Sequence, residues 1–430
     1  MATPQAPAPS DESSQSTLSD EELVTAAPEV LATSLREYLH AWAQKIRNGE
    51  SGALPVIVGL ILIIIFFRIE RRVFLSDTNI VNILTGSTIY VMLGAAEIFI
   101  LLLSEIDLSI GFGAGVGGLV IAELIASPVN LPWWLGIIGG MAVMAVFGAL
   151  QGSLVSRLNL PSFVVTLGGQ LALQGLLLVI ANLDPTAVGG VIQIDPGSPI
   201  YKLVNGTMSP GLSWAMVIAA VALFGIASLV KNRARTARGL TAPPLGVTLI
   251  SIAIAAIGGI LLVVTANANT PSGIPWVFPF VVLVLVFYTW LLGRTRIGRY
   301  IYAVGANPEA ARRAGINVRW IVTFAFIMSS VTACLAGVVY ESNQGSMSID
   351  INGGQLVLFA VATAVIGGTS LFGGRGRMFN ALLGGIVISV VVNGLAVMGV
   401  GAAAQDIATA VVLLAAVTLD SLVRRRAAAH

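Results

Sequence analysis

Long apolar segments recur along the chain from residue 51 to residue 419, separated by short polar connections. A helix needs about 20 mostly apolar residues to cross a hydrocarbon core of about 30 Å. The pattern predicts an all-α fold, a polytopic transmembrane helical bundle of about 12 spans (10–12). The twelve apolar windows are 51–67, 88–104, 108–126, 133–156, 161–181, 214–230, 245–264, 276–292, 320–340, 355–372, 378–400 and 402–419.

The composition agrees with membrane insertion. Of the 430 residues, 56% are hydrophobic and 10% are charged, and the mean hydropathy is +0.90. A soluble domain carries about 25% charged residues, so this chain has too few charges to cover a water-exposed surface. The formal net charge is only +2 and the basic residues form short clusters, which argues against nucleic-acid binding.

The inventory of reactive side chains is small. Cys334 is the one cysteine, and His40 and His430 lie outside the apolar windows. An intrachain disulfide and a cysteine or histidine metal site inside the bilayer are therefore excluded, and no metal is expected. The sequence also lacks the H-E-x-x-H and G-x-S-x-G patterns of common hydrolases, so no enzymatic activity is predicted.

The basic residues predict the orientation, because Lys and Arg collect on the cytoplasmic side of a membrane protein. With both termini placed in the cytoplasm, 19 of the 23 Lys and Arg residues fall inside. The exceptions are Lys202 and the group Arg68, Arg71 and Arg72 beside the first window. Either that group is a local exception or the first apolar stretch does not cross as drawn.

The N-terminal region differs from the rest of the chain. Residues 1–30 contain six acids and no Lys or Arg, and they are rich in Pro, Ser, Thr and Gln. We expect residues 1–48 to form a disordered acidic cytoplasmic tail, with a possible amphipathic helix over residues 31–47. Residues 49–426 are expected to form the transmembrane domain.

A short helix is predicted in the connection between the eighth and ninth windows. Asn307 is a favoured N-cap, Pro308 and Glu309 suit a first turn, and Gly315 suits a helix end. Such a basic connection is often only a solvated loop. The intervening positions are small or basic, so that one side of the helix can approach another protein closely: Ala310, Ala311, Arg312, Arg313 and Ala314.

Two carboxylates interrupt the second and third apolar windows. Glu105 and Asp107 lie within nearly forty apolar residues, where charge is costly and normally faces protein or water. They fit a tight cytoplasmic turn between two spans. They also fit a broken helix at membrane depth, in which Asp107 or Ser109 caps the next half-helix.

Uncharged polar residues recur at helical spacing in two windows. Thr166, Gln170 and Gln174 share one helix face, and Ser389 and Asn393 form a second pair. Such groups suit a path for a neutral, hydroxyl-rich solute. Hydrogen bonding between helices explains both sets equally well.

Residues 367–376 are rich in glycine but contain no lysine, so they cannot form a nucleotide-binding P-loop. Their glycines suit close helix packing and a turn at the inner membrane face. Any use of ATP must therefore depend on a partner chain.

Three blocks carry a resemblance to a known family. The first block is S-E-I-D-L-S-I-G at 104–111 and the third is I-G-G-T-S-L-F-G-G-R-G at 366–376. The second lies in 298–317 and includes Gly298, Arg299, Gly305, Asn307, Pro308, Glu309, Ala310, Ala311, Arg312, Arg313 and Gly315. With these blocks, the chain resembles the membrane subunits of the ribose/xylose/galactose class of bacterial ABC importers from about residue 75 to 423. The second block resembles the coupling segment of that family, and the glutamate in the first block resembles the xylose branch.

The resemblance implies a multi-pass subunit of the bacterial inner membrane that carries a monosaccharide, with xylose or a related pentose expected. It implies a second copy of the chain, an external sugar-binding protein, and a cytoplasmic ATPase that binds ATP and Mg while this chain binds no cofactor. Segment 298–317 would dock into the ATPase, and the connection 182–213 would be either a simple linker or the docking surface for the binding protein.

One departure from the family weakens the substrate expectation. An acidic stretch usually precedes the third block, whereas here residues 357–362 read V-L-F-A-V-A. A permease for a hexose, a nucleoside or another small polar solute therefore stays open. An ion-coupled secondary transporter is the alternative by mechanism, although no repeat of two halves is visible.

Overall fold

The computed structural model describes residues 54–183, 190–239 and 242–401, together with parts of 403–418. It confirms an all-α, polytopic fold. The helices of the membrane region are α3 (Leu54–Glu70), α4 (Asp77–Leu101), α5 (Ile110–Ile125), α6 (Trp133–Leu158), α7 (Ser162–Leu183), α9 (Pro210–Thr236), α10 (Leu245–Ala268), α11 (Val277–Arg294), α14 (Val318–Gln344), α15 (Gly353–Ile366) and α16 (Phe379–Val397).

Eight helices in the described residues are long and apolar enough to cross a membrane, and α5 and α15 are shorter apolar helices. The predicted tail over 1–48 lies outside the described residues, and the last predicted span over 402–419 is described only in part. The chain divides into two units, one containing residues 219–257 and the other containing the remaining described residues.

Two predicted helix boundaries were wrong. Helix α4 begins at Asp77, whereas the apolar window begins at residue 88, because its first half carries polar side chains that are buried against other helices. The Ser76 hydroxyl accepts a hydrogen bond from the Asn79 backbone and caps this start. Helix α15 ends at Ile366, six residues before its window does, because Gly367 and Gly368 turn the chain.

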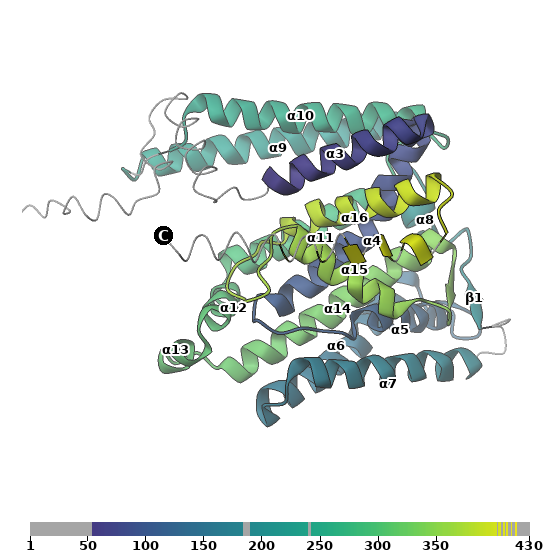
Figure 1. The fold of residues 1–430 in the computed structure, drawn as a ribbon, viewed down its shortest axis with the longest axis vertical. Coiled ribbons are helices and arrows are strands. Elements are labelled where there is room, and N and C mark those ends of the chain that lie inside the picture. The colour runs from purple at the N-terminus through teal and green to yellow at the C-terminus, as the bar shows by residue number, and fades with distance from the viewer. Residues whose placement is uncertain are drawn as a thin grey trace, which may run out of the picture. The chain divides into compact units, whose positions relative to one another are not determined.

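The core of the larger unit surrounds α4 and α14, whose apolar stretches are 83% and 72% buried. Figure 1 shows α4, α5, α14 and α15 at the centre of this bundle. Close approach between α5 and α14 depends on glycine, because a Cβ at Gly337 would overlap the Ala114 carbonyl oxygen. Fixed backbone contacts of this kind make the central helices a rigid unit.

The connection that follows α7 is structured in its described part. Strand β1 (Val191–Gln193) pairs antiparallel with β2 (Ser346–Ser348), and helix α8 (Pro199–Asn205) follows. The Ser342 hydroxyl on α14 accepts a hydrogen bond from the Val204 backbone at 2.9 Å, and the Ser342 carbonyl accepts one from the Asn205 amide at 2.6 Å. This segment is therefore attached to the end of α14.

The smaller unit contains the adjoining ends of α9 and α10. The Asn232 amide donates to the Thr248 hydroxyl at 2.7 Å, and Gly225 lies against Ile252. These contacts join the two helices side by side, as Figure 1 also shows.

Candidate functional site

The predicted short helix is present as α13 (Pro308–Arg313), directly after α12 (Arg296–Ala306). The Asn307 side chain accepts a hydrogen bond from the Ala310 backbone at 2.9 Å, which caps the first turn. Gly315 adopts φ +82°, and the backbone bonds from Gly315 to Arg312 and from Ile316 to Ala311 close a Schellman end. Both caps match the sequence prediction, so α13 is a short rigid element.

The alanines of α13 point in different directions. Ala311 is buried in this chain's own core, whereas Ala310 and Ala314 are exposed. Glu309 forms exposed ion pairs with Arg312 and Arg313, at 3.1 and 3.5 Å. Surface pairs of this kind add little stability. The face open to a partner is therefore formed by Ala310 and Ala314 with charged neighbours, while Ala311 anchors α13 to the bundle.

The three sequence blocks meet in space. The Gly374 backbone donates to the Leu102 carbonyl at 2.9 Å, and the Ser104 hydroxyl donates to the Phe372 carbonyl at 2.8 Å. These bonds attach the glycine-rich turn to the end of α4. Figure 1 shows α12 and α13 at the end of the bundle where α14 begins.

Gly305 of α12 completes this junction. A Cβ at Gly305 would overlap the Leu102 carbonyl oxygen and lie 2.9 Å from the Gly374 nitrogen. The Tyr302 hydroxyl donates to the Gly376 carbonyl at 2.8 Å. Burial raises the pKa of Tyr302, and the positive charge of Arg377 lowers it by a smaller amount. The close backbone approach requires glycine at position 305, so α12 packs directly against the end of α4 and the glycine-rich turn.

Asp107 lies in the connection between α4 and α5 and is fully buried. One carboxylate oxygen accepts hydrogen bonds from the Ser109 backbone at 2.9 Å and the Ser109 hydroxyl at 2.6 Å, and the other accepts one from the Ser329 hydroxyl at 3.1 Å. Ser329 lies about 16 Å along α14 from its first residue, at 1.5 Å per residue. Asp107 therefore lies within the bundle and connects the break between helices α4 and α5 to α14.

The connection between α4 and α5 resembles the predicted broken helix more than the predicted tight turn. Ser109 immediately precedes α5, but its side chain makes no capping bond to that helix. It lies 3.1 Å from the Gln151 side-chain oxygen on α6. Glu105 is half-buried, unlike Asp107. The two predicted carboxylates therefore occupy different environments.

Glu97 was missed by the sequence reasoning. It lies on α4, is fully buried, and its two oxygens make no hydrogen bond of good geometry with the described residues. Its carboxyl group is close enough to Asp107 for the two to interact electrostatically. An acid within an apolar window was a usable signal for this residue. Gln151 and Ser329, in contrast, become recognisable only after folding.

The three polar residues predicted to share one face of α7 differ in their burial. Thr166 is buried, and its hydroxyl lies 2.9 Å from the Ser162 carbonyl and 3.3 Å from the Ile106 carbonyl. Gln170 is half-buried and Gln174 is exposed in the single chain. Thr166 therefore packs α7 against the break, and the two glutamines are the members of this set that another molecule can reach.

The second predicted pair makes hydrogen bonds between helices. The Ser389 hydroxyl donates to the Ile83 carbonyl at 2.6 Å, and the Asn393 oxygen accepts from the Asn79 amide at 2.9 Å. Both bonds join α16 to α4. Packing thus accounts for these polar groups within the chain.

Residues 79–417 match the family model described as "Branched-chain amino acid transport system / permease component". The xylose transport system permease protein of Escherichia coli (strain K12) is 32% identical over 374 residues, covering 86% of this chain and 92% of the relative. The D-allose transport system permease protein of the same organism is 30% identical over 365 residues, covering 85% and 90%. The ribose import permease protein of the same organism is 27% identical over 386 residues, covering 90% of this chain and 96% of the relative. No solved structure matches the chain.

Proposed function

The chain belongs to the family of branched-chain amino acid transport system permease components, and we propose that it carries a monosaccharide through the membrane when a partner ATPase moves α12 and α13. It is a multi-pass inner-membrane permease subunit of the sugar ABC importer class, and it is not itself an enzyme.

One observation carries the proposal: the exposed, capped helix α13 continues from α12, which contacts the α4–α5 break and the glycine-rich turn. The contact at Gly305 involves backbone atoms of Leu102 and Gly374. Tightly packed backbone transmits displacement because it has little room to relax. A force applied to α13 therefore reaches the break directly.

A second route runs through α14. This helix begins at Val318, just after α13, and its Ser329 hydroxyl binds the Asp107 carboxylate at 3.1 Å. A tilt of α14 changes the bonds of Asp107, while displacement of α12 moves Leu102. Both routes end at the same short connection, which we propose as the part of the path that changes shape.

We propose xylose or a related pentose as the substrate. The permease named for xylose and the one named for D-allose are nearly equally similar to this chain, which makes a hexose the second candidate. Gln170 and Gln174 offer neutral hydrogen-bonding groups suited to sugar hydroxyls.

The proposed assembly contains a second copy of the chain, two ATPase subunits that bind ATP and Mg, and an external sugar-binding protein. The exposed face of α13 offers the ATPase two small residues, Ala310 and Ala314. The described part of the connection 182–213, including α8, is the proposed docking surface for the binding protein.

The test is uptake by the chain reconstituted with a partner ATPase and an external sugar-binding protein. We expect ATP-dependent uptake of xylose, compared directly with ribose and D-allose. Ala314→Trp should detach the ATPase or uncouple ATP hydrolysis from uptake, whereas Ala237→Trp, at an exposed alanine between α9 and α10, should leave both intact.

Two results would contradict the proposal. ATPase binding and uptake at the unmodified rate in Ala314→Trp would remove the coupling role of α13. Uptake driven by an ion gradient without ATP would instead identify a secondary transporter.

A further inference from the structure

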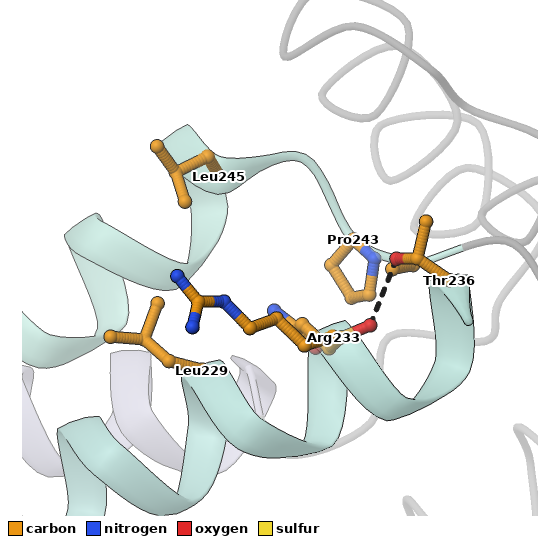
Figure 2. Close-up of a pocket in the computed structure, with 7 residues that line it drawn as sticks. Leu229, Arg233, Thr236, Pro243 and Leu245 are labelled. Atoms are coloured by element: carbon orange, nitrogen blue, oxygen red, sulfur yellow. Dashed lines mark hydrogen bonds between the residues drawn. The ribbon is translucent and has the colours of Figure 1, made fainter.

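A pocket of about 260 Å³ lies between the adjoining ends of α9 and α10. Arg233, Asn232 and Thr236 line it from α9, and Pro243 and Leu245 line it from the other side. In Figure 2 the Arg233 side chain extends past Leu229 toward Leu245. We propose that this pocket binds the anionic headgroup of a phospholipid from the cytoplasmic leaflet.

The pocket is held in shape by polar contacts within the unit. The Asn232 amide donates to the Thr248 hydroxyl on α10 at 2.7 Å, and the Thr236 hydroxyl donates to the Asn232 carbonyl at 2.9 Å. Figure 2 draws the second of these bonds. The Arg233 guanidinium is left as the strong donor group for an anion, and its planar N–H groups match phosphate oxygens.

The basic residues around the pocket have no acidic counterparts nearby in the sequence. No Asp or Glu occurs from residue 196 to 308, a segment that contains Lys231, Arg233, Arg235 and Arg238. In the part of the chain that the structure describes, none of these four forms an ion pair. Four clustered positive charges at the end of an apolar helix are the usual electrostatic signature of binding to anionic lipid.

The helices place the pocket at membrane level. The apolar stretches of α9 and α10 are only 17% and 11% buried. Phe224, Ile226 and Val230 on α9 and Leu249 and Ile254 on α10 are exposed. The basic residues place this end of the hairpin on the cytoplasmic side. A lipid with its headgroup in the pocket could therefore lay its acyl chains along these exposed apolar surfaces.

The size and chemistry of the pocket favour a lipid headgroup over other occupants. A volume of about 260 Å³ corresponds to about nine water molecules at about 30 Å³ each, which suits a phosphate with its glycerol and not a folded segment. Leu229 and Leu245 provide apolar walls that a free phosphate would leave uncovered. A phosphate joined to acyl chains satisfies both kinds of surface.

The experiment is a titration of the purified full-length chain with phosphatidylglycerol, in which native mass spectrometry counts bound lipid. We expect Arg233→Gln to weaken binding about fivefold, the effect of removing one basic residue near a charged membrane surface. Arg233→Lys should retain most of the binding. Arg238→Gln removes the same charge outside the pocket and serves as the matched control, with binding close to that of the unmodified chain.

Each remaining outcome would overturn the proposal. Equal weakening by Arg233→Gln and Arg238→Gln would mean diffuse attraction without a pocket. Equal binding of phosphatidylcholine would exclude selection of an anionic headgroup, and displacement of the lipid by inorganic phosphate would identify a soluble anion as the occupant. Binding that requires removal of residues 1–30 would show that the acidic tail occupies the pocket in the full-length chain.

Discussion

The two ends of α4 hold buried polar groups in opposite ways. Near its start, Asn79 bonds to Asn393 of α16, and the Ile83 carbonyl accepts from Ser389, so donors and acceptors are matched. Near its end, Glu97 is fully buried without a good hydrogen-bond partner among the described residues and lies beside Asp107. The start of α4 thus forms a fully hydrogen-bonded contact with α16, which we call the seam. The end of α4 has a buried carboxyl group with spare hydrogen-bonding capacity, next to the non-helical connection between α4 and α5.

The difference indicates that the start of α4 has a fixed position in the bundle and that the end of α4 can rearrange. A hydrogen bond between two helices is already satisfied, whereas the buried Glu97 carboxyl group interacts only with the Asp107 region and gains from any rearrangement that supplies a better donor. The unmatched end is also the end that contacts α12. We therefore expect substitutions there to affect transport and substitutions at the seam to affect stability.

The largest effect is expected from Gly305→Ala. The added Cβ overlaps the Leu102 carbonyl oxygen, so α12 and the end of α4 must separate, at a cost of about 1–3 kcal/mol for overpacking. Uptake in reconstituted vesicles should fall to background while the protein still inserts. Gly293→Ala is the control, because its added Cβ meets no atom within 4 Å beyond the adjacent residues and the backbone of its own helix. Unchanged uptake in Gly305→Ala would mean that this contact transmits nothing.

A smaller effect is expected from Asp107→Ala. The change removes the acceptor of the Ser109 backbone N–H and of the Ser329 hydroxyl, at about 1–3 kcal/mol for a buried unsatisfied group. Uptake per folded protein should fall about tenfold or more, equivalent to about 1.4 kcal/mol in the barrier. Thermal unfolding in detergent separates the two effects. Loss of stability with a normal uptake rate would make Asp107 a packing residue only.

Gln174→Leu should lower uptake by about threefold, the effect of losing one hydrogen bond of about 0.5–1.5 kcal/mol to a sugar hydroxyl. Gln174 is exposed in the single chain, so folding and membrane insertion of the chain should be unaffected. The measurements are uptake rate and protein level in the same membranes. Equal loss of both would indicate helix packing instead of a sugar path.

The smallest effect on uptake is expected from Asn393→Ala, because the seam carries no proposed motion. Loss of its bond to Asn79 should lower stability by about 0.5–1.5 kcal/mol. A double-mutant cycle with Asn79→Ala isolates this pair, with thermal unfolding as the measurement. A tenfold loss of uptake in Asn393→Ala would remove the distinction between the two ends of α4.

The sequence predicted local features well and long-range ones poorly. The caps of α13 at Asn307 and Gly315 were predictable because neighbouring residues determine them. The start of α4 was not, because hydropathy treats Asn79 and Thr85 as polar and cannot register that the fold buries them. The inward orientation of Ala311 likewise depends on packing against the rest of the bundle.

The meeting of the three sequence blocks could not be read from their spacing. Leu102 and Gly374 are brought together by helices that are far apart in the chain, through a contact between main-chain atoms that leaves little trace in side-chain pattern. The Ser329–Asp107 bond has the same origin. The resemblance identified each block as important, and only the fold shows that they act at one place.

Helix α14 connects the two faces of the membrane in a single element. It is 27 residues long, from the end of the α13 loop to the segment where Ser342 binds α8. At 1.5 Å per residue it spans about 40 Å. A free-energy coupling between two binding sites is reciprocal. If ATPase docking at α13 shifts α14 and loosens α8, then a protein that docks on α8 must change the affinity for the ATPase by the same factor. Docking of a sugar-loaded binding protein outside would then alter ATPase binding inside before any sugar has crossed.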